Sequence, residues 1–515
     1  MRKIFSILLL KVNEITIEIE YCITVLFHLR ITLVKLFRYS SLSILSCFFL
    51  IISFAQKKNI NSKPYPYGNP VIKHMYTADA SPHVMPDGRM WMVTSVDSED
   101  GGGYPTMHRY HTFSSADMKT WKDHGEVFNI EDVMPRDVKK QDWALWAPDM
   151  VYRNGKYYLY FPIWIHHTDS VRSNGKEGRV VTSYIGVAVS DAPDKHFKVL
   201  KSKIEGTSGI DPAVFSDDDG SVYLLWGHHK MGKLKDNMME LETKPVELDL
   251  GTERFMEAIW MHKRNGKYYI SYHTRYGNKI DKENPDDLIR EKSEIAYSYA
   301  DNINGPYQYG GIVNYELGVN VNNGPKLPGK NIVPWRLTQS NHVGIAEFHG
   351  HDYLFYHTSA LSSWRQDEFN NMGTWTQRSV CIDKLTYNAD GSIVPVQQTI
   401  EGVEEVIIKQ PFKIELLKNP VELTVNKALI YPNIPLGTGY YYFSVEVTKV
   451  TAPFVLQVKT KQGILLATLP VKENGRIEVC LNNAKGFQDI MILPIGNIEG
   501  ASLKSACFFA GSPSK

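Results

Sequence analysis

Residues 257–273 read EAIWMHKRNGKYYISYH and carry the pattern that decides the fold. An apolar stretch leads to Asn265-Gly266, and an alternating aromatic stretch follows. Asn-Gly is a strong short-range signal for a β-hairpin, because the type I′ turn needs positive φ angles at both central residues. The segment therefore predicts two antiparallel strands headed by an acidic residue, Glu257.

The same unit recurs four more times, each copy with an ionisable residue, an apolar strand, a turn containing glycine and an aromatic strand. These copies begin at Asp79, Asp149, Asp211 and His342. Internal repeats predict a repeat architecture. Blades of four strands around a central axis leave only short, protected sheet edges. Because the spacing between copies is irregular, the repeats favour blades with variable loops, and the sequence predicts an all-β, five-bladed β-propeller.

The five residues that head the repeats should face one funnel, because the innermost strand of each blade points its first residues at the axis. Any single Asp before a strand is most simply explained as a turn residue. Five ionisable residues in register are harder to explain in that way. Carboxylates that converge on one axis repel each other, so a function or a cation should compensate the cost.

Longer motifs around these residues resemble glycoside hydrolase family 43 over about residues 65–400. The matching segments are YTADASPHV (76–84), WAPDM (146–150), GIDPAVF (209–215), FMEAIWMHKRNGKYYISYH (255–273), NHVGIAEF (341–348) and RSVCIDKLTYNADGSIVPV (378–396). The chain departs mildly from the family pattern at Ala80 and Ile259, where proline is common. The resemblance implies a five-bladed propeller that hydrolyses glycosidic bonds.

The family pattern also implies roles for individual residues. Asp79 is expected to be the general base, Glu257 the general acid, and Asp211 the residue that orients the acid and tunes its pKa. His342 is expected to help hold a central water or a calcium ion. The resemblance thus allows a structural calcium at the propeller axis, whereas hydrolysis itself requires no cofactor.

Inverting hydrolysis places particular demands on these carboxyl groups. The two reacting groups must lie on opposite sides of the scissile bond, roughly 6.5–9.5 Å apart, so that a water fits between them. A free Glu has a pKa of about 4.3. We therefore expect the ionised Asp211 and the apolar neighbours of Glu257 to raise the pKa of this acid.

Four further residues are candidates for substrate binding. Asp149 could bind sugar hydroxyls, and a structural role is equally open. Trp146 and Trp260 could form walls of the pocket, although buried aromatic side chains also serve as core. Arg378 could reach a carboxylate or a sugar hydroxyl, or lie at the rim of the core.

Residues 1–55 are predicted to be a leader. A short basic stretch precedes an apolar run that ends near Ser53 and Ala55, the small residues of a cleavage site. This layout is typical of a secretory signal peptide near residues 35–55, so the mature protein is expected to be secreted or periplasmic, with no membrane partner. Residues 1–34 precede this signal and suggest an upstream start codon, with a membrane-retained N-terminus as the alternative.

The remaining sequence is expected to form two domains. We assign residues 56–400 to the propeller, 401–415 to a connector and 416–515 to a smaller, jelly-roll-like β-sandwich. The last region resembles family 6 carbohydrate-binding modules, especially at GTGYYYFSVEV (437–447) and GFQDIMILPIG (486–496). It contains no Trp, so a purely structural cap is equally open.

The net charge limits the classes of partner that we expect for this protein. The formal net charge is +1 and the pI is near 7.7, which gives no reason to expect nucleic acid as a partner. The favoured function is an inverting glycosidase for plant-type polysaccharide or oligosaccharide, of the α-L-arabinofuranosidase or β-xylosidase type. Two alternatives stay open: a catalytically silent glycan-binding propeller, and a galactan- or arabinan-cleaving member of the family. The oligomeric state is not predicted.

Overall fold

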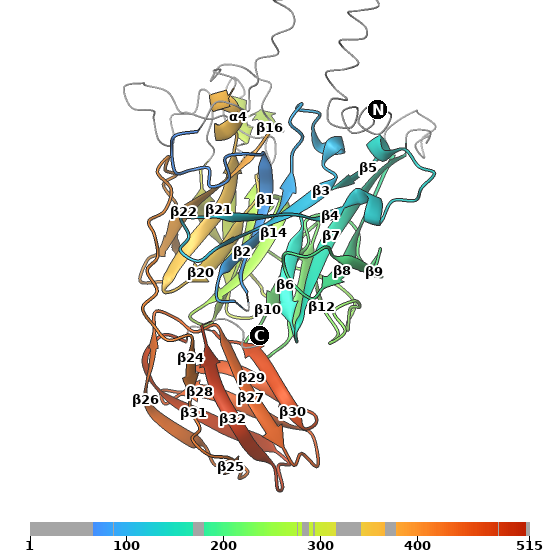
Figure 1. The fold of residues 1–515 in the computed structure, drawn as a ribbon. Helices are drawn as coiled ribbons and strands as arrows, with labels where there is room; N and C mark the ends of the chain where they lie inside the picture. Colours follow the sequence, from blue (N-terminus) through green and yellow to red (C-terminus); the bar gives the residue numbers. More distant parts are fainter. Residues whose placement is uncertain are drawn as a thin grey trace, which may run out of the picture. The chain divides into compact units, whose positions relative to one another are not determined.

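The computed structural model describes residues 65–85, 87–167, 180–274, 277–280, 288–291, 294–315, 341–365, 377–482 and 484–510. Strands dominate these segments (Figure 1). The predicted leader and its signal peptide lie outside the described residues. Within the described part of the chain, no helix has the length and apolar character needed to cross a lipid bilayer.

Five antiparallel sheets follow one another along the chain and form the blades (Figure 1). Blade 1 contains β1 (Thr77–Val84), β2 (Met90–Val96), β3 (Arg109–Ser115) and β4 (Lys122–Asn129). Blade 2 contains β5 (Trp143–Leu145), β6 (Asp149–Arg153), β7 (Lys156–His167), β8 (Val180–Ser190) and β9 (Lys198–Lys201). Blade 3 contains β10 (Ala213–Ser216), β11 (Val222–Trp226), β12 (Lys230–Lys233) and β13 (Val246–Glu247).

Blades 4 and 5 complete the propeller. Blade 4 contains β14 (Phe255–Arg264), β15 (Lys267–Thr274), β18 (Ile295–Ala300) and β19 (Gln308–Asn314). Blade 5 contains β20 (Gly344–Phe348), β21 (His351–Thr358), β22 (Ser379–Tyr387) and β23 (Ile393–Val394). In the described segments between these strands lie a separate hairpin and short helices: β16 (Gly277–Ile280), β17 (Leu288–Glu291), η2 (Tyr104–Thr106), η3 (Ile130–Asp132), η4 (Lys140–Asp142) and α4 (Ala360–Arg365).

The hairpin turns at the Asn-Gly pairs of blades 2 and 4 have the predicted backbone conformation. In blade 4, Asn265 and Gly266 have φ angles of 49° and 80°, and in blade 2, Asn154 and Gly155 have φ angles of 47° and 81°. Two consecutive positive φ angles are the mark of a type I′ turn, whose twist matches that of the flanking strands. The hairpins predicted from these Asn-Gly pairs are therefore confirmed.

The segment before β1 joins the first blade to the last. The Asn69 side chain donates to the carbonyl of Ile382 at 3.0 Å and accepts from its N–H at 2.9 Å. The N–H of Thr77 donates to the carbonyl of Arg378 at 3.0 Å. Because each blade is built from one continuous segment, these bonds connect the two ends of the ring without exchange of a strand.

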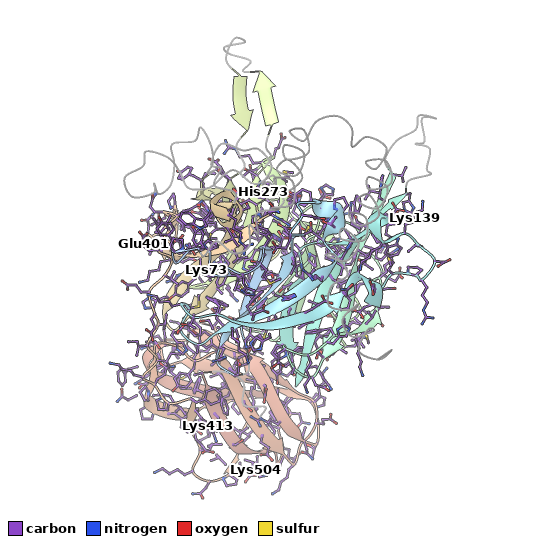
Figure 2. All side chains as sticks on the ribbon, turned by 45° about the horizontal axis from the view of Figure 1, so that its top comes forward. Lys73, Lys139, His273, Glu401, Lys413 and Lys504 are labelled. Atoms are coloured by element: carbon purple, nitrogen blue, oxygen red, sulfur yellow. The ribbon has the colours of Figure 1, made fainter. Side chains whose placement is uncertain are left out.

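The C-terminal region forms two sheets that pack as a β-sandwich around a core that includes Phe443, Leu456 and Phe508. One sheet contains β24 (Lys413–Glu415), β25 (Val421–Glu422), β27 (Tyr442–Thr448), β30 (Gly475–Cys480) and β32 (Ser502–Phe509). The other contains β26 (Leu429–Gly437), β28 (Phe454–Thr460), β29 (Leu465–Val471) and β31 (Gly486–Gly496). Lys413 and Lys504 mark β24 and β32 in Figure 2. The all-β fold class, a propeller followed by a sandwich, is confirmed.

The sandwich shares contacts and core with the propeller. The Tyr442 hydroxyl donates to the carbonyl of Val84 at 2.9 Å. Tyr442 and Phe509 also belong to one hydrophobic cluster with Met85 and Trp91 of blade 1. β24 begins at Lys413, inside the range that we predicted to be the connector.

Candidate active site

The first strands of blades 1, 3 and 4 share a backbone irregularity at one end. Asp79 and Asp211 both have φ angles of 56°, and Ala258 has a φ angle of 60°. In β1 and β14 these residues lie where the register with the next strand shifts, which identifies β-bulges. A left-handed backbone at a non-glycine residue costs of the order of 1–3 kcal/mol and is concentrated at functional sites. Bulges of this kind re-aim side chains next to active sites.

A cavity of about 430 Å³ lies at these bulges. It is lined by six of the residues that the sequence predicted for the site: Asp79, Trp146, Asp211, Glu257, His342 and Arg378. They come from all five blades or from the loops that lead into them. The predicted convergence of distant acidic residues on one cavity is therefore present in the structure.

Asp79 is held in its ionised form. Arg378 Nη1 donates to Asp79 Oδ1 at 2.9 Å, and the hydroxyl of Ser95 donates to Oδ2. Burial acts to raise the pKa of Asp79, but the charge of Arg378, helped by His342 and His357, outweighs burial and holds this pKa at about 2. A carboxylate that stays ionised across the neutral range is what a general base requires.

Asp97 fixes Arg378 and was missed by sequence reasoning. Its carboxylate accepts from Arg378 Nε at 2.9 Å, from Nη2 at 2.8 Å and from the backbone N–H at 2.8 Å. Asp97 is 2% exposed, so these bonds form away from water. The residue follows β2 in the run Asp97-Ser98-Glu99-Asp100, whose composition is that of an ordinary loop.

Asp211 and Glu257 form an interacting carboxyl pair. Burial, followed by the charge of Glu257, raises the pKa of Asp211 well above its ordinary value, although the N–H of Ala258 donates to Asp211 Oδ2 at 2.9 Å. Two interacting carboxyl groups take up protons as a pair. The raised pKa that the structure shows is that of Asp211, the predicted partner of Glu257. Glu257 is the more exposed partner, with 22% of its side chain accessible.

Trp146 forms an aromatic wall of the cavity. Its ring stacks on Trp164 with centroids 5.1 Å apart, and its indole N–H donates to the carbonyl of Tyr104 at 3.1 Å. Trp164 thus packs against one face of the Trp146 ring, and the hydrogen bond holds its edge. A rigid aromatic surface suits the apolar face of a sugar ring.

His342 lines the cavity, and burial lowers its pKa. Its Nδ1 is buried, without a hydrogen-bond partner among the described residues. Calcium takes about 6–8 oxygen ligands. Across the described ranges, no group of three or more His, Cys, Asp or Glu side chains could hold a metal, and Asp79 is already engaged by Arg378. The calcium therefore stays a sequence-based prediction.

Asp149 does not line the cavity. The carboxylate is fully buried, accepts from the hydroxyl of Ser81 and from the N–H of Val214 at 2.5 Å, and lies 2.8 Å from His83 Nε2. These partners belong to blades 1 and 3, so Asp149 connects three neighbouring blades inside the protein. Asp149 was predicted to bind sugar hydroxyls or to have a structural role, and its position in the structure corresponds to the structural role.

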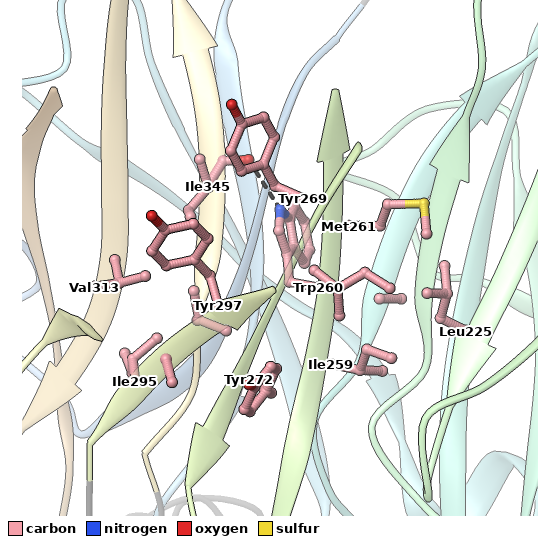
Figure 3. Packing of buried hydrophobic residues seen from close by; sticks show 14 of the residues in the cluster. Leu225, Ile259, Trp260, Met261, Tyr269, Tyr272, Ile295, Tyr297, Val313 and Ile345 are labelled. Atoms are coloured by element: carbon pink, nitrogen blue, oxygen red, sulfur yellow. Dashed lines mark hydrogen bonds between the residues drawn. The ribbon is translucent and has the colours of Figure 1, made fainter. Parts of the chain in front are cut away.

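Trp260 also lies outside the cavity. Its indole N–H donates to the carbonyl of Ile345 at 2.9 Å, as Figure 3 shows, and the ring lies 5.3 Å from that of His83. Blade 4 does not adjoin blade 1 in a five-bladed ring, so Trp260 connects two blades that are not neighbours. Its predicted role as a wall of the cavity is corrected to that of a buried core residue. Together with Asp149, it connects strands of all five blades.

Comparison with known proteins agrees with this geometry. The model of the family "Glycosyl hydrolases family 43" matches residues 67–393, which is more than half of the chain. The chain belongs to glycoside hydrolase family 43. Xylosidase/arabinosidase 43A of Humicola insolens is 33% identical over 383 residues, which cover 63% of this chain and 98% of that protein.

Two further relatives of this family 43 glycosidase extend the comparison. The arabinoxylan arabinofuranohydrolase of Paenibacillus polymyxa is 25% identical over 532 residues, covering 88% of this chain and 76% of that protein. The crystal structure of the GH43_1 enzyme from Xanthomonas citri complexed with xylose is 28% identical and covers 65% of this chain and 95% of that one, with a TM-score of 0.48.

Proposed function

We propose that this family 43 enzyme is an inverting glycosidase that removes α-L-arabinofuranosyl or β-D-xylosyl residues from plant-type glycans. The observation that carries the proposal is the convergence of Asp79, Asp211 and Glu257 from three blades on one cavity. The similarity to proteins named xylosidase/arabinosidase and arabinoxylan arabinofuranohydrolase supports this class of substrate.

In the proposed reaction, a water attacks the anomeric carbon while Asp79 takes one of its protons. Glu257 gives a proton to the glycosidic oxygen as the bond between that oxygen and the anomeric carbon breaks. The products are the free sugar, with its anomeric configuration inverted, and the alcohol of the leaving group. Neither step needs a cofactor, since both reacting groups are carboxyl groups of the chain.

The electrostatics of the cavity support these roles. The low pKa of Asp79 keeps the base ready to accept a proton. The Asp211–Glu257 pair retains a proton to higher pH than two separate carboxyl groups would, because burial and mutual repulsion disfavour two charges. In this assignment Asp211 orients Glu257 and shares its proton, while Glu257, the more exposed of the two, delivers it to the substrate.

The test is hydrolysis of 4-nitrophenyl α-L-arabinofuranoside, β-D-xyloside and β-D-galactoside by the wild type and by Glu257→Gln. Removing a general acid typically costs about 10²–10⁴-fold in rate, so Glu257→Gln should lose activity on that scale. Glu253→Gln is the matched control, because Glu253 is exposed and lies four residues earlier in the chain. Equal activity of Glu257→Gln and the wild type would remove Glu257 from the mechanism.

The stereochemistry has its own test. Proton NMR of the sugar released in the first minutes should show the anomer opposite to that of the substrate. Appearance of the retained anomer first would replace the attack of water by a covalent glycosyl-enzyme mechanism.

The leader and the sandwich carry two further proposals. Export of the protein rests on the signal-peptide pattern and predicts that the secreted chain begins near Gln56, which N-terminal sequencing can check. Glycan binding by the sandwich rests on its resemblance to carbohydrate-binding modules. Retention of the chain on insoluble arabinoxylan, compared with the chain ending before Lys413, tests it.

A further inference from the structure

The second strands of blades 4 and 5 both end in Tyr-His-Thr, with His273 in β15 and His357 in β21. Both imidazoles are buried, 0% and 2% exposed. Each Nδ1 accepts a hydrogen bond from a backbone N–H of the next blade. Asn341 donates to His273 at 3.5 Å, and Asp79 donates to His357 at 3.3 Å. The two blades thus repeat one arrangement beside the two proposed reacting carboxyl groups.

The backbone donor determines which nitrogen of His273 carries the proton. A backbone N–H can only donate, so the Nδ1 that receives it presents a lone pair. In a neutral imidazole the proton then lies on Nε2, because one ring nitrogen donates and the other accepts. Nδ1 of His273 is therefore an acceptor toward its surroundings.

Nδ1 of His273 also lies 3.3 Å from Glu257 Oε1. An ionised Glu257 would set oxygen lone pairs against the lone pair of Nδ1, and no proton would join the two atoms. A protonated Glu257 instead donates its O–H to Nδ1. A hydrogen bond made by the neutral form of an acid favours that form, so this contact selects the protonated carboxyl group.

We propose that His273 is a positioning residue that keeps Glu257 in its protonated form and aims that carboxyl group before catalysis. The inference rests on the proposed role of Glu257 as the general acid. His273 does not touch the substrate in this scheme, since it lies behind Glu257 and does not line the cavity. It acts by accepting a hydrogen bond from the O–H of Glu257, and the proton stays on Glu257 until the substrate receives it.

Within the part of the chain that the structure describes, the other titratable groups around Glu257 are compatible with this role. Asp211, from the segment before β10, forms a carboxyl pair with Glu257, and two negative charges at this pair would repel each other. His342, from the segment before β20, is kept neutral by burial. The cation of the cavity, Arg378, is engaged by Asp79 and Asp97.

The matching histidine of blade 5 shows how neighbours change the outcome. His357 Nδ1 lies 3.6 Å from Asp79 Oδ1, beyond hydrogen-bond distance. Asp79 takes its donors from Arg378 and Ser95 and stays ionised. The same backbone arrangement therefore lies beside an ionised base in one blade and a proton-bearing acid in the other.

Two variants of His273 test the inference. His273→Leu removes the acceptor, whereas His273→Asn keeps an oxygen near the position of Nδ1. Both are assayed on phenyl and 2,4-dinitrophenyl glycosides of the sugar that the wild type cleaves fastest. Phenol needs protonation as it leaves and 2,4-dinitrophenol does not. His273→Leu should lower kcat/KM for the phenyl glycoside about tenfold more than for the dinitrophenyl glycoside, within the range of general acid catalysis.

The pH profile gives the second readout. The basic limb of kcat/KM should move to lower pH in His273→Leu and should return toward the wild-type position in His273→Asn. An equal loss on both leaving groups with an unmoved basic limb would overturn the inference. If His273→Leu does not fold, His273→Gln, which moves the acceptor by one carbon, replaces it in the same comparison with His273→Asn.

Failure of the inference and failure of the proposed function give different results. If Glu257→Gln shows the leaving-group dependence and the His273 variants do not, Glu257 is the acid and His273 has no part in holding its proton. If Glu257→Gln also lacks the dependence, the proposed function itself fails.

Discussion

Removal of Arg378 should raise the pKa of the proposed base, Asp79, into a pH range in which its titration affects kcat/KM. The structure holds the pKa of Asp79 at about 2, against an ordinary value of 3.8. A difference of about 2 units corresponds to about 2.5 kcal/mol, at about 1.36 kcal/mol per unit. Because Asp97 would be left buried and unpaired by the loss of Arg378, the informative variant combines Arg378→Met with Asp97→Asn.

The sign of the change follows from the two opposing causes. In the wild type Arg378, together with the neighbouring histidines and the Ser95 hydroxyl, outweighs burial. Asp79 therefore stays ionised down to about pH 2, and kcat/KM should show no acid limb at mildly acidic pH. In the double variant burial acts without the cation, and the pKa of Asp79 should rise above its ordinary value. An acid limb should then appear between about pH 4 and pH 6.

The assay is kcat/KM for the fastest aryl glycoside from acidic to neutral pH, with circular dichroism at each pH to confirm the fold. Arg378→Lys is the control. It keeps a cation near Asp79 but loses the planar guanidinium group that donates two side-chain hydrogen bonds to Asp97. Its kcat/KM should fall less at acidic pH than that of the double variant. A folded double variant whose acid side matches that of the wild type would refute the role given to Arg378.

Three further predictions concern stability. Asp149→Asn should lower Tm, because an amide NH₂ would face buried donors at a cost of about 1–3 kcal/mol, while KM for aryl glycosides stays unchanged. Asp383→Asn should destabilise the protein on the same scale, since its carboxylate accepts from the Tyr356 hydroxyl at 2.6 Å and from the Thr399 hydroxyl at 2.5 Å. Tyr441→Phe should cost about 0.5–1.5 kcal/mol in urea unfolding, because it removes a hydroxyl bonded to the propeller; an unchanged midpoint would contradict that contact.

The repeats predicted the blades well because hairpin signals are local. Asn265-Gly266 and the aromatic strand after it specify one hairpin without information from the rest of the chain. The register was harder to predict, because it depends on turn length and bulges. Asp79 lies nine residues before its turn glycine, whereas Asp149 lies six before its own. Counting back from the turn would have separated the cavity-lining Asp79 from the internal Asp149.

Other parts of the site depend on contacts between distant segments. Asp97 and Arg378 are 281 residues apart, and nothing near Asp97 in the sequence marks it as the partner of a buried cation. His273 did leave a signal, because Tyr-His-Thr recurs at His357. Its meaning required the position of the Asn341 N–H, which only the packing of blade 5 beside blade 4 provides.

The buried contacts of Asp149 and Trp260 make the five blades depend on one another. Asp149 joins strands of blades 1, 2 and 3, and Trp260 joins strands of blades 4, 5 and 1. Every blade takes part in at least one of these contacts. A shift of any single blade would therefore break a buried contact and disturb the cavity that the same five blades line.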